Sequence, residues 1–371
     1  MNVLFTQGLE DLECFRVERR NTMIPNYKIT EEILNLVQKI SELATQLSFE
    51  TMGLHLRKEN RISSIQSSLA IENNSLSLEQ VTDVIEGKRV LGPLKDIHEV
   101  QNAYEAYEKV FRLNPYSIDD FLLAHRLLTQ DLVKHPGQFR LGDVGVFDGE
   151  GKVVHLGARP QFVPKLVSDL FSWAKSSHIS DIVKSCIVHF ELEIIHPFED
   201  GNGRMGRMWQ SLILSRWNPL FEWLPVESVI YRHQSGYYQA LTESNEVNDS
   251  TKFIQFMLEA ILETLLDYSH QKNDSTEKSV KLLLKPRELA IFEKIESYLV
   301  ENYQITTAVA QELTGLSAAT MRRYLQLFVN QGLLEKSGST KNTLYSLIFK
   351  IQLCFHISWK LMKIKEQDGT N

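Results

Sequence analysis

The chain has 371 residues, of which 43% are hydrophobic and 23% are charged, and its formal net charge is −7. This composition is typical of folded domains rather than of a disordered chain, and the length allows two or three of them. The acidic balance excludes a general nucleic-acid binder but leaves room for a local basic module.

The terminus, the apolar segments and the cysteines together predict a cytoplasmic protein. Residues 1–20 carry acids where a secretory signal needs lysines and a small-residue cleavage site. No run of 18 apolar residues occurs, so we expect no membrane span. Cys14, Cys186 and Cys354 are far apart in the chain, which argues against a disulfide framework or a zinc ribbon.

Residues 28 to about 112 predict a series of helices, because apolar side chains recur at spacings of three and four. One of these helices ends with Glu72, which continues its apolar stripe just before the helix-stop residue Asn73. The helix dipole disfavours a carboxylate at this end, and an unpaired charge on an apolar stripe is costly. We therefore expect Glu72 to need a cationic partner.

Residues 141–164 break the helical pattern. Their β-branched residues alternate around the turn sequence DGEGK, which predicts a β-hairpin. Helices then resume, and the one that ends near residue 195 is apolar around most of its circumference, which predicts a central buried helix. Because Pro197 disfavours helical backbone at His196, this helix should stop there, and the next should start near Arg204.

The polar segment 266–280 predicts a linker to a second domain. Residues 281–348 predict helix, turn, helix and a small β-wing, and they resemble a winged helix-turn-helix. Arg322, Arg323 and Tyr324 lie on the second of these helices, where they could contact DNA phosphates or bases. The segment 281–350 has nine Lys or Arg against six Asp or Glu, a modest excess. DNA binding and a packing or protein-binding role therefore both stay open, and the tail 349–371 carries no prediction.

The stretch HPFEDGNGRMGR, residues 196–207, gathers the groups that phosphate chemistry needs. Its glycines precede a helix N-terminus, where backbone N–H groups can receive a phosphate. Arg204 and Arg207 share one helix face and can reach neighbouring phosphates. Asp200 suits Mg²⁺, which prefers one or two carboxylates plus phosphate oxygens, and His196 can remove a proton from an attacking hydroxyl.

This stretch resembles the signature of the Fic family, HxFx(D/E)GNGRxxR, at every defined position, and the resemblance extends over roughly residues 60–250. It implies a mainly α fold. A helical core with a β-hairpin flap, residues 96–265, would follow a helical region, residues 1–95, that contains an inhibitory helix. It also implies a protein adenylyltransferase, which moves AMP from ATP to a Ser, Thr or Tyr hydroxyl of a target protein, or of itself, and releases pyrophosphate.

The resemblance also implies roles for individual residues. His196 would be the catalytic base, Phe198 would anchor the loop and Asp200 would hold Mg²⁺. Arg207 would grip the γ-phosphate. ATP would further contact a phosphate loop, formed by Gly201, Asn202, Gly203, Arg204, Met205 and Gly206. It would contact the flap that follows GQFR (137–140), through Lys152, Val153, Val154 and His155. Its adenine and ribose would bind to Tyr237, Tyr238 and Asn245.

Upstream, the segment SSLAIEN (67–73) is similar to the inhibitory pattern of the family, (S/T)xxxE(G/N), with Ser68, Glu72 and Asn73 in place. The resemblance implies that Glu72 pairs with Arg207 and keeps ATP from the productive pose. Because both residues belong to one chain, the inhibition would be intramolecular.

Other functions stay open on the sequence. The chain could be a transcription regulator whose core senses a nucleotide, or an enzyme that transfers another nucleotide or phosphate-bearing group. It could also remove AMP from a modified protein, in which case Glu72 would orient a water. Homodimerisation is common among related proteins and stays open as well.

Overall fold

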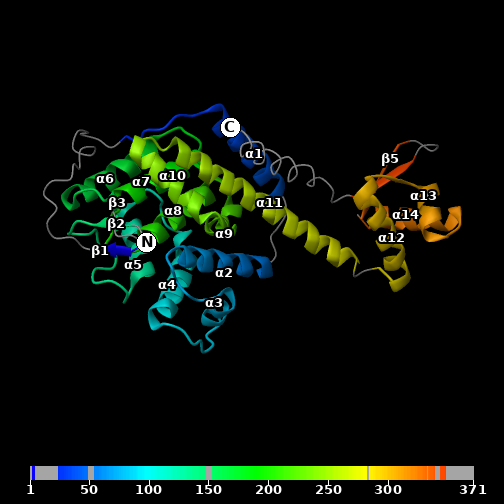
Figure 1. Cartoon of the computed structure of the whole chain (residues 1–371), viewed down its shortest axis with the longest axis horizontal. Helices are drawn as coiled ribbons and strands as arrows, with labels where there is room; N and C mark the ends of the chain where they lie inside the picture. The colour runs from blue at the N-terminus through cyan, green and yellow to red at the C-terminus, as the bar shows by residue number, and fades with distance from the viewer. Residues whose placement is uncertain are drawn as a thin grey trace, which may run out of the picture. The chain divides into compact units, whose positions relative to one another are not determined.

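The computed structural model describes residues 2–4, 24–48, 54–147, 153–281, 284–331, 333–338 and 343–347. The chain divides after Tyr268 into two compact units. Both are built mainly from helices, so the expected mainly α class is confirmed (Figure 1). Within these ranges no helix is both long enough and apolar enough to span a membrane.

Helices account for most of the first unit. Before the hairpin lie α1 (Glu31–Ser48), α2 (Leu54–Ile71), α3 (Leu78–Ile85), α4 (Leu94–Val110) and α5 (Ile118–Thr129). After the hairpin come η1 (Pro160–Phe162), α6 (Val163–Ser176), α7 (Asp181–Ile195), α8 (Asn202–Trp217), η2 (Pro219–Glu222), α9 (Val226–Arg232), α10 (Gln234–Val247) and α11 (Thr251–Lys281).

Helix α7 lies at the centre of the first unit. Every residue from Ile182 to Leu192 is buried, as the sequence predicts. The helix supplies Val188 and Leu192 to one hydrophobic cluster and Ile187 and Phe190 to a second. Helix α8 packs along α7 and also contributes to both clusters. The loop that joins α7 to α8 is therefore fixed at both ends by the most deeply buried helices of the unit.

The predicted hairpin consists of β2 (Gly145–Phe147) and β3 (Val153–Leu156), which pair antiparallel. Gly145 lies opposite Leu156, and the register shifts between Val146 and Phe147. A further strand, β1 (Asn2–Leu4), pairs with β2 and completes a sheet of order β1-β2-β3. The turn sequence DGEGK falls outside the described residues.

The helix boundaries around the glycine-rich loop follow local backbone chemistry. Helix α7 ends at Ile195, and His196 is its C-cap, as Pro197 predicts. Helix α8 begins at Asn202, two residues earlier than expected, because Gly201 serves as its N-cap with a left-handed φ of 84°. Glycine reaches this conformation at little cost, whereas other residues do so rarely.

The predicted linker, residues 266–280, is not an irregular loop. Helix α11 runs through it, although the division between the units does fall inside it. The polar composition suggested a break, but the segment contains neither glycine nor proline. Its Lys, Glu and Gln residues are good helix formers, so nothing in it stops a helix that began in an apolar stretch.

The second unit contains α12 (Pro286–Asn302), β4 (Ile305–Thr306), α13 (Thr307–Thr314), α14 (Ala318–Asn330), β5 (Leu334–Ser337) and β6 (Leu344–Leu347). The strands form an antiparallel sheet of order β4-β6-β5. Gly315 makes the turn between α13 and α14 with a φ of 70°. Phe292 and Phe328 pack edge to face in an apolar core, with ring centroids 5.1 Å apart. The helix, turn, helix and hairpin occur where the sequence predicts them, and the tail 349–371 is outside the described residues.

Candidate active site

His196 lies at the C-terminal end of α7 in a left-handed conformation, with φ at 52°, and is only 7% exposed. Its Nδ1 lies 3.2 Å from the backbone oxygen of Glu193. A carbonyl can only accept, so Nδ1 carries a proton and Nε2 is the basic nitrogen of the neutral ring. Burial lowers the pKa of His196, although the charge of Glu193 opposes the shift. The ring is thus kept neutral, which is the form a general base requires.

Arg140 holds the backbone on which His196 sits. Its Nε donates to the His196 oxygen at 2.7 Å, and its Nη1 donates to the Gly142 oxygen at 2.8 Å. Nη2 donates to the oxygens of Ala158 and Ile195. Burial lowers the pKa of Arg140 to about 10, so the side chain stays cationic at neutral pH. A single guanidinium therefore caps α7 and joins it to both flanks of the hairpin.

The loop after His196 is built around Phe198 and Asn202. The Asn202 side chain accepts from the Phe198 N–H and donates to the Phe198 oxygen, both at 2.9 Å. Phe198 is fully buried, as expected of an anchor, and its ring stacks on His125 with centroids 3.6 Å apart. The Asn202 amide thus supports the loop itself, and its backbone N–H, which has no intrahelical partner at the start of α8, is available for the predicted phosphate contact.

His125, on α5, joins this loop to Gly137 through hydrogen bonds of its ring. The Gly137 N–H donates to its Nδ1 at 2.9 Å, so its Nε2 carries the proton and donates to the Asp200 oxygen at 3.0 Å. Burial lowers the pKa of His125 to about 4, which keeps the ring neutral at physiological pH. The neutral tautomer makes both bonds at once, whereas a protonated ring would lose the Gly137 bond.

Asp200 is a loop carboxylate that faces solvent in part, with 44% of its side chain exposed. Its Oδ1 accepts from the Gly201 N–H at 2.7 Å and lies 3.3 Å from Arg204 Nη2. Burial alone would raise the pKa of Asp200, but Arg204 and the Gly201 N–H outweigh it and lower the pKa. An ionised and accessible carboxylate is a suitable ligand for Mg²⁺.

No group of three or more His, Cys, Asp or Glu side chains that could hold a metal occurs within the described ranges. A metal held by Asp200 would take its remaining ligands from phosphate oxygens and water. This division suits Mg²⁺, which is bound through one or two carboxylates plus substrate phosphates.

Arg207 is buried and faces the end of α2. Its side chain is 1% exposed, and its Nη2 lies 2.8 Å from Glu72 Oε1 and donates to the Ser68 oxygen at 3.0 Å. Its Nε donates to Ser68 Oγ at 3.2 Å. Burial would lower the pKa of Arg207, but the charges around it, Glu72 first among them, raise it. The expected pairing of Glu72 with Arg207 is present.

Glu72 also covers the N-terminus of α8. A Cβ atom at Gly203 would collide with Glu72 Oε1 and lie 3.0 Å from Arg207 Nη1. The Glu72 carboxylate therefore lies against the first turn of α8, where backbone N–H groups and the helix dipole favour an anion. It takes the position that the sequence assigns to phosphate.

Helix α10 holds the end of α2 from the other side. Gln234 Nε2 and Tyr238 Oη donate to the Ile71 oxygen, at 3.0 and 3.3 Å. Tyr237 is buried, and its hydroxyl lies 3.0 Å from His189 Nε2. Asn245 lies two turns further along α10 and is half-buried.

The remaining predicted residues fall into four groups. Gly206 packs against α7, where an added Cβ would lie 2.5 Å from Glu193 Oε1, and Met205 is buried in the core. For Val153, Val154 and His155 only the backbone of β3 is described, and Lys152 lies outside the described residues. Asn73 follows Glu72 with φ at 67°. On α14 of the second unit, Arg322 and Arg323 are exposed and Tyr324 is half-buried.

Several residues of the site escape a reading of the motif. Arg140 belongs to the segment GQFR, and neither His125 nor Glu99, which lies 3.3 Å from Arg204, belongs to a sequence motif. Their partners are distant in the chain, so no local spacing could reveal them. A histidine with a glycine 12 residues further along the chain is the weak signal that the sequence offers for His125.

Three comparisons relate this geometry to known proteins. The Fic/DOC family profile matches residues 115–214. Protein adenylyltransferase fic-1 of Caenorhabditis elegans is 28% identical over 289 residues, which cover 72% of this chain and 54% of the relative. A probable protein adenylyltransferase of Aquifex aeolicus is 28% identical over 196 residues, or 52% of this chain and 56% of the relative. The chain thus spans about half the length of these curated relatives.

Among solved structures, a Fic family protein from Desulfovibrio desulfuricans G20 is 38% identical. It covers 88% of this chain, 98% of its own chain is covered, and the TM-score is 0.66. Fic-1 of C. elegans, residues 134–508, is 21% identical with a TM-score of 0.55, which shows likeness of fold.

Proposed function

Because this chain belongs to the Fic family, we propose that it is a protein adenylyltransferase that moves AMP from ATP to a hydroxyl of a target protein. One observation carries the proposal: a neutral histidine, an accessible carboxylate and two buried arginines converge on the N-terminus of α8. Names of relatives that contain the word adenylyltransferase support the same reaction.

The chemistry follows from the positions of these groups. His196 Nε2 takes the proton of the target hydroxyl, whose oxygen forms a bond to the α-phosphorus of ATP. The bond from the α-phosphorus to the bridging oxygen breaks, and pyrophosphate leaves with the electron pair. Arg204, Arg207 and the N–H groups of α8 neutralise the phosphates, because phosphoryl-type transfer depends on positioning and charge. Mg²⁺ held by Asp200 would add further neutralisation of the leaving pyrophosphate.

We further propose that Glu72 inhibits this reaction within the same chain. Its carboxylate holds Arg207 at 2.8 Å and lies over Gly203, so it competes for both the arginine and the helix N-terminus that the phosphates need. The Glu72 side chain is 30% exposed, and one helix end carries it, so it can leave without unfolding the core.

The experiment is intact-mass analysis of the Glu72→Gly protein after incubation with Mg²⁺ and one nucleoside triphosphate at a time. We expect the mass of one AMP to be added from ATP, and no addition when His196→Ala is introduced as well. A mass increment of UMP or of another group would replace the proposal with transfer of that group. Loss of AMP from a modified target, dependent on Glu72, would replace it with AMP removal.

For the second unit we propose DNA contact through α14, since Arg322 and Arg323 are exposed on the second helix of a helix-turn-helix. In that case the first unit could act as a nucleotide sensor for a regulator of transcription. Unaltered mobility of DNA fragments at low salt would leave a protein-binding or packing role for this unit.

A further inference from the structure

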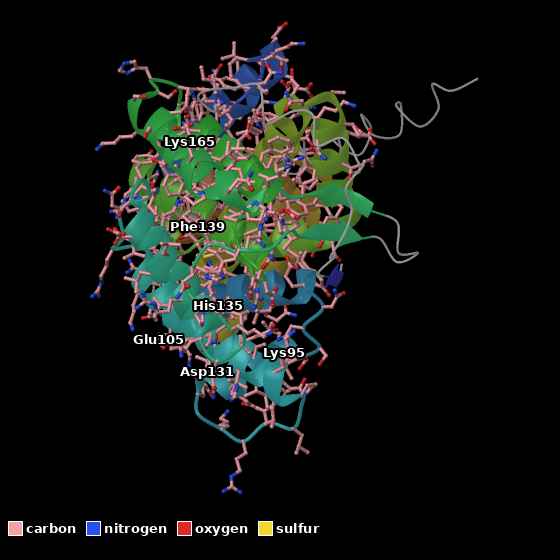
Figure 2. The ribbon with its side chains drawn as sticks, turned by 90° about the vertical axis from the view of Figure 1, so that its left-hand side faces the viewer. Lys95, Glu105, Asp131, His135, Phe139 and Lys165 are labelled. Carbon is pink, nitrogen blue, oxygen red and sulfur yellow. The ribbon has the colours of Figure 1, made fainter. Side chains whose placement is uncertain are left out.

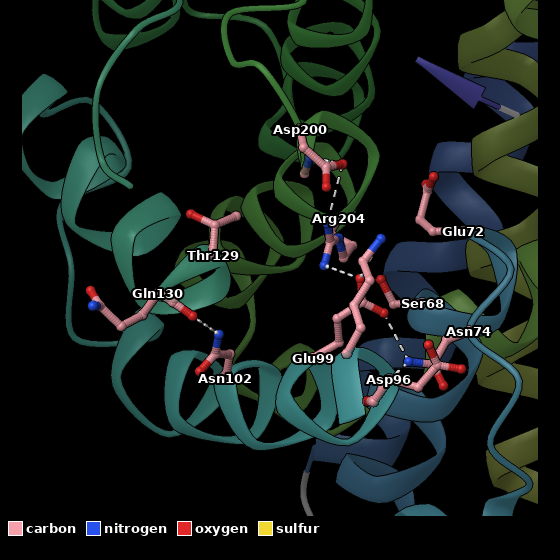
Figure 3. A network of polar contacts seen from close by, with 12 residues as sticks. Ser68, Glu72, Asn74, Asp96, Glu99, Asn102, Thr129, Gln130, Asp200 and Arg204 are labelled. Carbon is pink, nitrogen blue, oxygen red and sulfur yellow. Dashed lines mark hydrogen bonds and ion pairs between the residues drawn. The ribbon is translucent and has the colours of Figure 1, made fainter. Parts of the chain in front are cut away.

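Glu99, on α4, is a buried carboxylate that contacts both Arg204 in the first turn of α8 and Asn74 in the segment after α2 (Figure 3). Its Oε1 lies 3.3 Å from Arg204 Nη1 and 3.8 Å from Lys95 Nζ. Its Oε2 accepts from Asn74 Nδ2 at 2.9 Å. Each oxygen of Glu99 thus serves a different element of the site.

Arg204 has two acidic partners that differ in their freedom to move. The Asp200 side chain is 44% exposed, whereas that of Glu99 is 9% exposed. If Asp200 turns to Mg²⁺, its bond to Arg204 weakens, and Glu99 is left as the fixed partner. Arg204 Nε has no hydrogen-bond partner among the described residues, so the two carboxylates satisfy only part of the guanidinium.

The segment after Glu72 is hydrogen-bonded to α4. Asn74 Nδ2 donates to the Asp96 oxygen at 3.1 Å as well as to Glu99. Ser75 donates through its N–H and its hydroxyl to Asp96 Oδ2, at 2.8 and 2.6 Å. Glu72 therefore lies between the end of α2 and an anchored turn, and loosening this turn gives its carboxylate freedom to leave Arg207.

We propose that Glu99 is a positioning residue with two tasks: it orients Arg204 for the phosphates, and through Asn74 it holds the turn that keeps Glu72 on Arg207. The proposal rests on the function proposed above. It adds a second carboxylate to the control of the site, one that stays in place when Glu72 is gone.

The first test is Asn74→Ala in two backgrounds. With Glu72 present, loss of the hydrogen bonds of Asn74 to α4 raises the affinity for Mg²⁺–ATP and the rate of AMP transfer. The increase is roughly threefold to tenfold, since one or two hydrogen bonds are lost. In the Glu72→Gly background the same substitution changes the affinity and the rate by less than about twofold, because the Glu72 carboxylate that these hydrogen bonds keep on Arg207 is absent. Equal effects in the two backgrounds would overturn the coupling.

The second test is Glu99→Gln in the Glu72→Gly background. This isosteric change removes the charge that orients Arg204, so KM for ATP and Kd for Mg²⁺–ATP rise together, by roughly tenfold or more. A merely structural role would instead lower kcat at constant KM, through a smaller folded fraction. The control is Glu105→Gln on the exposed side of α4, where the acid pairs with Lys109 (Figure 2).

Equilibrium binding of ATP separates failure of this proposal from failure of the proposed reaction. If no variant transfers AMP but Kd follows the expected order, the reaction is wrong and the role of Glu99 stands. If Glu99→Gln and Glu105→Gln bind Mg²⁺–ATP equally well, the role of Glu99 is wrong even when AMP transfer is observed.

Discussion

The two units of this chain bury different kinds of side chain. The first buries arginines and carboxylates, including Arg140, Arg204, Arg207 and Glu99. Within residues 284–331, 333–338 and 343–347 of the second, no charged side chain is buried. Charge is costly to bury unless it is paired, so the placement of these four around the loop between α7 and α8 indicates a site shaped for ligands rather than for stability. The described part of the second unit instead relies on apolar packing.

Among the changes that test this difference between the units, Arg140→Ala should have the largest effect. The substitution leaves four backbone oxygens without a charged donor, so we expect the free energy of unfolding of the first unit to fall by about 5 kcal/mol. Urea unfolding followed by circular dichroism measures it, with exposed Arg89→Ala as the control. Equal midpoints for the two variants would show that this buried arginine does not support the loop.

In the second unit the matching change is Phe328→Ala. Phe328 is fully buried against Phe292, so truncation should cost about 4 kcal/mol in that unit. We expect the affinity of the first unit for Mg²⁺–ATP to stay the same. A parallel loss of ATP binding would mean that the two units do not act as separate folding units.

His125 should make the stability of the first unit depend on pH. Its folded-state pKa of about 4 lies below the ordinary value of 6.5, so protonation favours the unfolded chain. Stability is therefore complete above pH 6.5 and is lost as the pH falls toward 4, by up to about 3 kcal/mol from this residue. The His125→Gln protein should show a flatter profile than the wild type in this window. Identical profiles would contradict the neutral, doubly bonded ring.

The smallest effect is expected at the surface of the second unit. If α14 contacts DNA phosphates, the double change of Arg322 and Arg323 to Ala should reduce the salt dependence of binding by about two in the log–log slope. Titration of labelled fragments at several salt concentrations measures this. An unchanged slope would remove α14 from the interface.

Local chemistry explains what could be predicted from the sequence. The residues of HPFEDGNGRMGR, and Glu72 within its own segment, can be recognised by their spacing along the chain. Pro197 sets the end of α7 through backbone sterics.

The supporting residues could not be predicted, because their roles arise from partners far along the chain. Arg140 bonds a residue 56 positions away, and Glu99 lies 105 positions before Arg204. At residues 266–280, where the division between the units falls, polar composition does not reveal that a helix continues through the segment.

The central claim is that Glu72 and the terminal phosphate of ATP compete for Arg207. The most direct measurement compares the affinities of the wild type and the Glu72→Gly protein for ATP and for ADP, both with Mg²⁺. We predict that only Glu72→Gly binds ATP more tightly than ADP, and that adding Arg207→Ala abolishes this preference. An equal preference for ATP in the wild type and in Glu72→Gly would contradict the claim.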